Sequence, residues 1–174
     1  MKIFITNLGR YNEGYLVGKW VKLPVCEDVL DKVLKEIGID EYYEEYFITD
    51  YENEIIGIGD VISEYSSVQA LNELAQRLEE LSDDEADKLG AVLEYEACRS
   101  VSEVLELLDK LDEFDLLTDV TDDEELGYYY AEEYCCIDIP EYIQPYFDYE
   151  KFGRDVRLQS CCLYTSYGFL LDNR

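Results

Sequence analysis

Carboxylates are the most abundant side chains in this sequence that could carry out chemistry. The 174 residues include 42 Asp and Glu. Close pairs such as Glu94 with Glu96, or Asp122 with Glu125, could serve as the acid and base of a glycosidase. Because acids are so frequent, such pairs arise from composition alone. We therefore assign no catalytic residue, and an enzyme with a buried carboxylate pair stays only an alternative.

Histidine and cysteine chemistry is nearly absent. The chain contains no His, which excludes Ser-His-Asp triads, Cys-His dyads and zinc sites that use His. No C-x-x-C pair occurs, and directly adjacent cysteines are too close for an ordinary disulfide. The six cysteines are Cys26, Cys98, Cys135, Cys136, Cys161 and Cys162. We predict a reduced, cytoplasmic protein without a metal site.

Binding motifs for calcium, phosphate and membranes are also missing. The segment that starts at Asp50 supplies the first three ligand positions of a calcium loop but lacks the Gly and the final Glu. Neither phosphate-binding glycine motif occurs. No apolar run is long enough for a signal peptide or a membrane span. We expect no cofactor and no membrane partner.

The net charge of −28 is the strongest constraint on partners. It is spread along the chain, and it is densest in residues 79–134, with 21 acidic and 3 basic side chains. Such a field repels nucleic acid, so direct DNA binding is nearly excluded. A duplex carries the same number of charges over about 48 Å. Three explanations stay open from composition: an acidic surface that is merely solvated, a partner with a long cationic groove, or adaptation to high salt.

Residues 1–62 predict a small α+β domain. The segments 2–9 and 15–23 are rich in β-branched and aromatic residues, and a turn separates them, so we expect antiparallel strands. Apolar residues from Val29 to Ile37 recur at helical spacing and end at Gly38. Residues 44–51 follow as a third strand.

Residues 63–112 predict a helical domain with an acidic exterior. Leu71, Leu74, Leu78 and Leu81 form one apolar stripe, and a second stripe runs from Val101 to Leu111. Three helix starts are predicted by capping patterns: Ser66 with Gln69, Ser82 with Glu85, and Ser100 with Glu103.

Residues 113–174 predict a third domain, again α+β. Thr121 with Glu124 predicts a helix through the three tyrosines 128–130, of which at least one must be exposed or held against another subunit. A second helix is expected from Pro140 to Gly153, and a hairpin within residues 156–171.

Two stretches of the sequence resemble the ArdA antirestriction family. The first is FITNLGRYNEGYLVGKW, residues 4–20, and the second comprises IPE at 139–141 and YFDYEKFGRD at 146–155. They occur in the order and at the distance typical of that family, and the resemblance spans essentially the whole chain. The residues that carry it are Asn7, Tyr11, Asn12, Glu13, Gly14, Gly18, Trp20, Pro140, Tyr146, Asp148, Tyr149, Phe152, Gly153, Arg154 and Asp155.

The resemblance implies an elongated, curved protein of three domains that forms a homodimer through its C-terminal domain. It implies mimicry of bent B-form DNA, by which the protein occupies the DNA-binding groove of type I restriction-modification enzymes and inhibits restriction on behalf of a mobile genetic element. The groove belongs to the specificity and modification subunits, and no reaction is catalysed.

Under this resemblance, carboxylates stand in for phosphates. The candidates are Glu79, Glu80, Asp83, Asp84, Glu85, Asp87, Glu94, Glu96, Glu103, Glu106, Asp109, Asp112, Glu113 and Asp115. A further acidic segment corresponds to one near the family's subunit interface and contains Asp119, Asp122, Asp123, Glu124 and Glu125. The main alternative is an acidic adaptor or chaperone-like protein that binds a basic partner.

Overall fold

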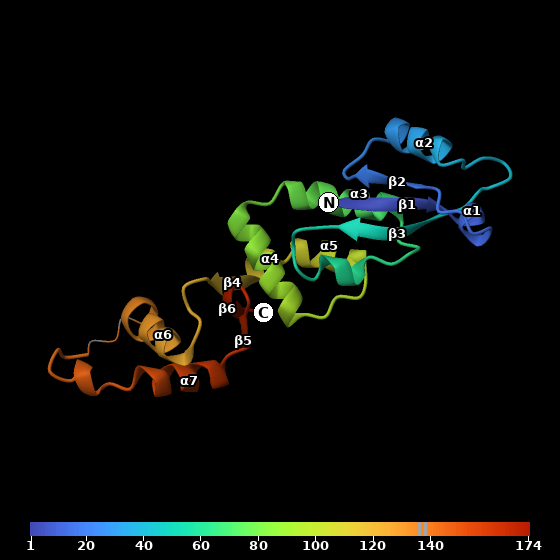
Figure 1. Ribbon diagram of the computed structural model, residues 1–174. Helices are drawn as coiled ribbons and strands as arrows, with labels where there is room; N and C mark the ends of the chain where they lie inside the picture. Colours follow the sequence, from blue (N-terminus) through green and yellow to red (C-terminus); the bar gives the residue numbers. More distant parts are fainter. Residues whose placement is uncertain (136, 138) are drawn as a thin grey trace. The chain divides into compact units, whose positions relative to one another are not determined.

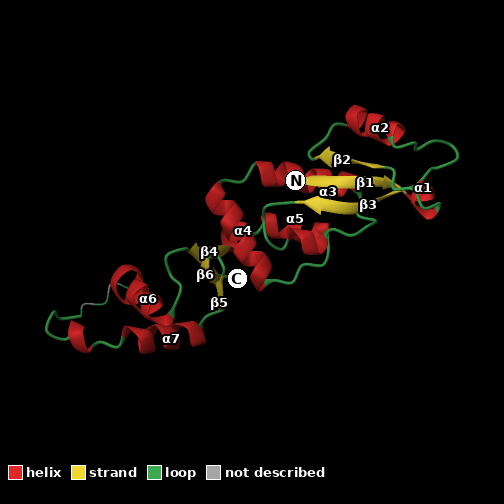
Figure 2. Cartoon of the chain, viewed as in Figure 1, coloured by secondary structure: helices red, strands yellow, loops and turns green. Residues whose placement is uncertain are grey.

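In the computed structural model, which describes residues 1–135, 137 and 139–174, the chain is α+β, as predicted. It divides into two compact units: residues 1–86 with 97–109, and residues 87–96 with 110–174. The three domains predicted from the sequence, at 1–62, 63–112 and 113–174, stay a prediction. Figure 2 shows the helices and strands in colour.

The first unit contains a three-stranded antiparallel sheet (Figure 1). Strand β1 (Lys2–Asn7) lies between β2 (Gly18–Lys22) and β3 (Tyr46–Glu52). Ile3 and Ile5 of β1 are fully buried, which is the alternation expected for a strand with one covered face. The three predicted strands are thus confirmed.

Four helices and a 3-10 turn complete this part of the chain. They are α1 (Leu8–Asn12), α2 (Glu27–Glu36), η1 (Ile58–Val61), α3 (Val68–Glu79) and α5 (Val101–Leu108). Helix α2 ends as predicted, because Gly38 adopts a left-handed φ of 80° just beyond it. Helices α3 and α5 pack together through their apolar stripes, in which Leu71, Leu74 and Val104 are fully buried.

The second unit contains another antiparallel sheet, in the order β4-β6-β5. Its strands are β4 (Phe114–Leu117), β5 (Cys162–Thr165) and β6 (Gly168–Asp172). The C-terminal hairpin is confirmed by β5 and β6, whereas β4 was not predicted. Helix α4 (Asp83–Tyr95) begins in the first unit and continues into the second, where the short turn η2 (Leu111–Glu113) also lies.

Two helices dominate the rest of the second unit. Helix α6 (Asp123–Tyr128) continues into a π-helical segment, η3 (Tyr129–Tyr134), and it packs along α7 (Tyr149–Gln159). The predicted helix from Pro140 to Gly153 was wrong. A short 3-10 turn, η4 (Gln144–Tyr146), precedes α7, which begins after the Asp148 cap and runs past Gly153.

Two of the four predicted caps are shifted by one residue. Ser67, not Ser66, caps α3 by accepting from the Ala70 N–H, and Ser66 Oγ accepts from the Ser63 N–H instead. Asp122, not Thr121, caps α6, and Glu125 accepts from Thr121. The Ser82–Glu85 box is confirmed in both directions, and Ser100 caps α5.

Candidate interaction surface

The predicted phosphate-mimicking carboxylates lie on the surface. Of the nineteen acidic residues named from the sequence between Glu79 and Glu125, all are exposed except Glu96 and Asp123, which are half-buried. The seventeen exposed side chains therefore face solvent and lie outside the apolar core.

Helix termini hold many of these acids. Asp83, Asp84 and Glu85 occupy the first turn of α4, and Asp123, Glu124 and Glu125 occupy the first turn of α6. The N-terminal end of a helix carries a partial positive charge, so acids there are locally stabilising. The fold thus offsets part of the repulsion that such a dense negative surface creates.

Helix α5 separates its apolar and acidic residues cleanly. Val101, Val104, Leu107 and Leu108 are buried, while Glu103 and Glu106 are exposed on the opposite side. Asp109, the C-cap, continues the acidic side one step further. These three carboxylates are three residues apart, so successive ones are separated by about 4.5 Å along the helix axis.

Several surface carboxylates are held by neutral donors that leave their charge in place. Glu94 accepts from the Ser166 backbone N–H and hydroxyl, Glu103 accepts from the Arg99 backbone N–H, and Asp115 accepts from the Asn173 amide. Such bonds orient a carboxylate without neutralising it. Asp109 differs, because Arg77 pairs with it at 2.8 Å.

Asp123 belongs to a local ion-pair network. Arg157 on α7 donates two hydrogen bonds to its carboxylate, at 2.7 and 3.0 Å, and the Tyr164 hydroxyl donates a third at 2.9 Å. The Arg157 bonds hold the pKa of Asp123 below its usual value, while burial and the bond to Asp123 raise the pKa of Tyr164. Asp123 therefore joins α6, α7 and β5, and a free phosphate-like role fits it less well than its neighbours.

Glu96 also has an internal partner. Arg174 donates to Glu96 and makes two hydrogen bonds to Asp172, at 2.7 and 2.8 Å, while its guanidinium lies 4.5 Å from the Phe114 ring centre. The bonds from Arg174 are the main cause that lowers the pKa of Asp172 to about 2. Sequence patterns gave no signal for this cluster, because Glu96 and Arg174 are 78 positions apart.

The Asp172 cluster predicts a specific pH dependence. A carboxyl whose pKa is lowered by folding stabilises the folded state above its unfolded pKa, and this contribution is lost as the pH falls. We expect Asp172→Asn to be less stable than the wild type above pH 4, and the difference to shrink as the pH falls from about 4 to 2. Urea unfolding across this range measures it. Asp112→Asn, an exposed control, should show no such convergence, and a constant deficit in Asp172→Asn would contradict the prediction.

The residues of the first motif have structural roles. Asn7 is buried, accepts from the Arg10 N–H at 2.9 Å, and donates to the carbonyls of Ile37 and Gly38 at 3.2 and 3.0 Å. It therefore fixes the start of α1 against the end of α2. Gly14 has a left-handed φ of 91°, which favours glycine. The motif also makes ring contacts of Tyr11 with Phe47 and of Trp20 with Phe4. Glu13 accepts a hydrogen bond from the Tyr43 hydroxyl and pairs with Arg10.

Two further positions of the first motif are Gly18 and Asn12. A Cβ at Gly18 would lie 2.7 Å from the Ile5 carbonyl oxygen, so only glycine fits beside β1. Asn12 is exposed at the end of α1, and nothing in the structure explains its presence in the motif.

The second motif builds α7 and its contact with α6. Asp148 caps α7 by accepting from the Lys151 N–H, and the Tyr149 hydroxyl donates to Glu132 at 2.8 Å. A Cβ added at Gly153 would lie 1.9 Å from the Asp123 carbonyl oxygen, so the two helices approach each other closely. Phe152 contacts Phe147, whereas Pro140, Tyr146, Arg154 and Asp155 are exposed, as is the capping residue Asp148.

The described part of the chain contains no metal-binding arrangement. Among these residues, no three His, Cys, Asp or Glu side chains converge as metal ligands. The same part of the chain has no helix of the length and apolarity that crossing a membrane requires. The candidate site is thus the set of exposed carboxylates described above.

The fold and this surface define an acidic α+β protein suited to binding a cationic partner. Comparison with known protein families shows which family the chain is related to. The model of the family described as antirestriction protein (ArdA) matches residues 3–170. The chain therefore belongs to the ArdA antirestriction family, as the two sequence motifs indicated. A search of curated proteins found no match.

Proposed function

We propose that this antirestriction protein imitates bent B-form DNA and occupies the DNA-binding groove of a type I restriction-modification enzyme. The observation that carries the proposal is the set of seventeen exposed carboxylates between Glu79 and Glu125. A groove that binds DNA presents Lys and Arg to phosphates, and exposed carboxylates offer those cations the same sign of charge. Competition for the groove inhibits restriction, and modification as well where both use the same groove.

The spacing of the acids supports this proposal. The axial step of about 4.5 Å between the acids on α5 is about a third longer than the 3.4 Å or so per phosphate along one strand of a duplex, so the two charge spacings are of the same order. If the enzyme recognises the protein through many such carboxylates, no single carboxylate is indispensable, because each exposed ion pair contributes little to the binding free energy. Attraction between the two surfaces should also speed association.

We further propose that the protein acts in the cytoplasm as a homodimer joined through residues 113–174, and that it has no catalytic step. Its partners are then a second copy of itself and the specificity and modification subunits of the enzyme. A dimer would carry two copies of the acidic surface, one on each protomer. This would extend the length of groove that the protein can occupy.

A competition experiment tests the proposal. A labelled duplex is bound to a purified type I modification enzyme, and the protein is added at two salt concentrations without ATP. We expect displacement of the duplex, and weaker binding of the protein at higher salt. Failure to displace DNA from any enzyme of this class, by protein shown to be folded, would favour the adaptor alternative. An acidic chaperone would instead bind unrelated cationic proteins equally well.

A further inference from the structure

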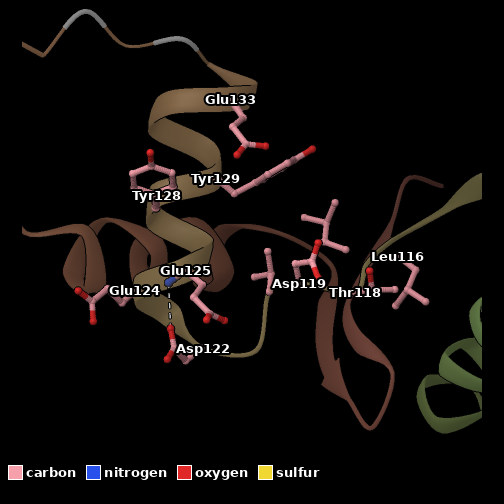
Figure 3. A pocket seen from close by; sticks show the side chains of 11 residues that line it. Leu116, Thr118, Asp119, Asp122, Glu124, Glu125, Tyr128, Tyr129 and Glu133 are labelled. Atoms are coloured by element: carbon pink, nitrogen blue, oxygen red, sulfur yellow. Dashed lines mark hydrogen bonds between the residues drawn. The ribbon is translucent and has the colours of Figure 1, made fainter.

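The second unit contains a pocket of about 670 Å³ that no motif predicted. Its walls come from residues 116–120, which include the end of β4, from the first turn of α6, and from Tyr128, Tyr129 and Glu133 (Figure 3). All of these residues belong to the same unit. The pocket is therefore a feature of this unit alone.

The pocket combines apolar walls with negative charge. Val120 is buried, and Leu116, Leu117 and Tyr129 are half-buried. Asp119 and Glu124 are exposed among the residues around them, and no Lys or Arg lines the pocket. An occupant must therefore present both a positive charge and a flat or apolar surface.

The wall that carries Tyr129 has a rare backbone conformation. Tyr129–Tyr134 is π-helical, a geometry that is uncommon and often found at functional sites. Tyr129 and Glu133 project from the side of the helix on which Asp119 lies, whereas Tyr128 projects from the other side (Figure 3). The Tyr129 ring is held by ring contacts with Tyr130 and Tyr134, at 5.7 and 6.4 Å between centres. An aromatic face and carboxylates are thus set in place together.

This combination suits a guanidinium better than a metal ion or an ammonium. Among the described residues, no three acidic side chains converge as metal ligands. A guanidinium is planar, stacks on aromatic rings and pairs with carboxylates through two parallel hydrogen bonds, whereas an ammonium is compact and strongly hydrated. Burial, followed by the charges of Glu133 and Asp115, raises the pKa of Tyr129, which agrees with a negative potential there.

We propose that this pocket receives an arginine side chain from the DNA-binding surface of the partner enzyme, and that the homodimer proposed above leaves the mouth of the pocket open. The guanidinium stacks on Tyr129 and pairs with the carboxylates of Asp119 and Glu133, and the aliphatic stem packs on Leu117 and Val120. The source of the arginine rests on the proposed function, whereas the pocket's preference for a guanidinium does not. Such an anchor gives one fixed register to a surface whose other charges bind diffusely.

The pocket is tested first without any enzyme. The isotope-labelled full chain is titrated with N-acetyl-L-arginine methylamide, and separately with the lysine analogue, while amide shifts are followed by NMR. We expect saturable shifts in residues 116–133, with the arginine probe binding about threefold more tightly than the lysine probe. Equal affinities, or shifts spread over all acidic segments, would overturn the proposal.

Variants of the pocket show whether ring stacking or charge accounts for binding of the arginine probe, and they control for misfolding. Tyr129→Leu should remove the preference for arginine, whereas Tyr129→Phe should keep it, because the ring is retained. Glu106→Gln, on α5, lies outside the pocket and should leave the titration unchanged. If Tyr129→Leu loses its dispersed NMR spectrum, it has unfolded, and the proposal is then tested by comparing Tyr129→Phe with Asp119→Asn. Of these two variants, only Asp119→Asn should bind the arginine probe more weakly than the wild type.

The enzyme competition then tests the source of the arginine. Tyr129→Leu should compete with duplex DNA about fivefold less well than Tyr129→Phe. If the wild type binds the arginine probe in this pocket but displaces no DNA, the proposed function fails and the pocket stands. If the wild type displaces DNA and Tyr129→Leu does so equally well, the pocket does not receive a partner arginine.

Discussion

Neutralising seven exposed carboxylates together is expected to weaken binding to the restriction enzyme about a hundredfold. Each exposed ion pair changes affinity by about twofold, and contacts of this kind multiply when they are separate. The variant replaces Asp with Asn and Glu with Gln at Glu79, Glu80, Asp84, Asp87, Glu106, Asp112 and Glu113, all of which are exposed. Glu106→Gln alone should stay within about twofold of the wild type.

Competition with a labelled duplex at fixed salt measures this effect, and a salt series adds a second readout. Fewer carboxylates facing the partner should make the affinity less dependent on salt. The variant should remain folded, and urea unfolding should show it to be at least as stable as the wild type, because self-repulsion falls. A loss of affinity can then not be attributed to unfolding.

A matched control separates the position of the charges from their number. The control variant neutralises seven exposed carboxylates elsewhere, at Glu27, Asp28, Asp31, Glu41, Glu44, Glu54 and Asp60. It has the same net charge as the first variant and should lose much less affinity. Equal losses in the two variants would show that net charge alone drives binding. A tenfold loss from several unrelated single changes would refute the distributed surface.

Local sequence patterns predicted the first unit well. The strands β1, β2 and β3 and helix α2 depend on alternation, helical spacing and a terminal glycine, all of which lie within a few residues. The positions of the acids could also be predicted, because an acidic residue opposite a buried stripe has only solvent to face. The exposure of Glu103 and Glu106 on α5 follows from this rule.

The errors arose where neighbouring residues compete or where contacts are distant in sequence. Pro145 disfavours the α conformation at Gln144, so a helix could not continue from Pro140, and Asp148 provided the next cap. Strand β4 has only four residues, and its partner β6 lies more than fifty positions later. The Tyr129 pocket was also missed. Its lining lies within residues 116–133, but no local pattern predicts how β4, α6 and the π-helical segment pack together.

Replacing Gly153 with Ala is expected to destabilise the second unit by about 1–3 kcal/mol. The new Cβ would lie 1.9 Å from the Asp123 carbonyl oxygen and 2.5 Å from the Gly127 nitrogen, so it would meet backbone that no rotamer change can move. Gly127 faces the same constraint from the Tyr149 carbonyl oxygen. Helix propensity favours Ala by up to about 1 kcal/mol, which offsets only part of the cost. Helices α6 and α7 must therefore move apart.

Urea unfolding and amide hydrogen exchange measure this prediction, with exchange expected to accelerate in α6 and α7 and to stay unchanged in β1–β3. Gly9→Ala is the matched control, because the nearest atoms to its Cβ belong to the Tyr43 side-chain ring, which can rotate away, and not to backbone. Gly9→Ala should lower the free energy of unfolding by less than Gly153→Ala does. Since α6 leads directly into the π-helical segment that carries Tyr129, Gly153→Ala should also weaken binding of the arginine probe to the pocket. An unchanged unfolding free energy would mean that α6 and α7 do not pack this closely, and the role of Gly153 in the family motif would need another cause.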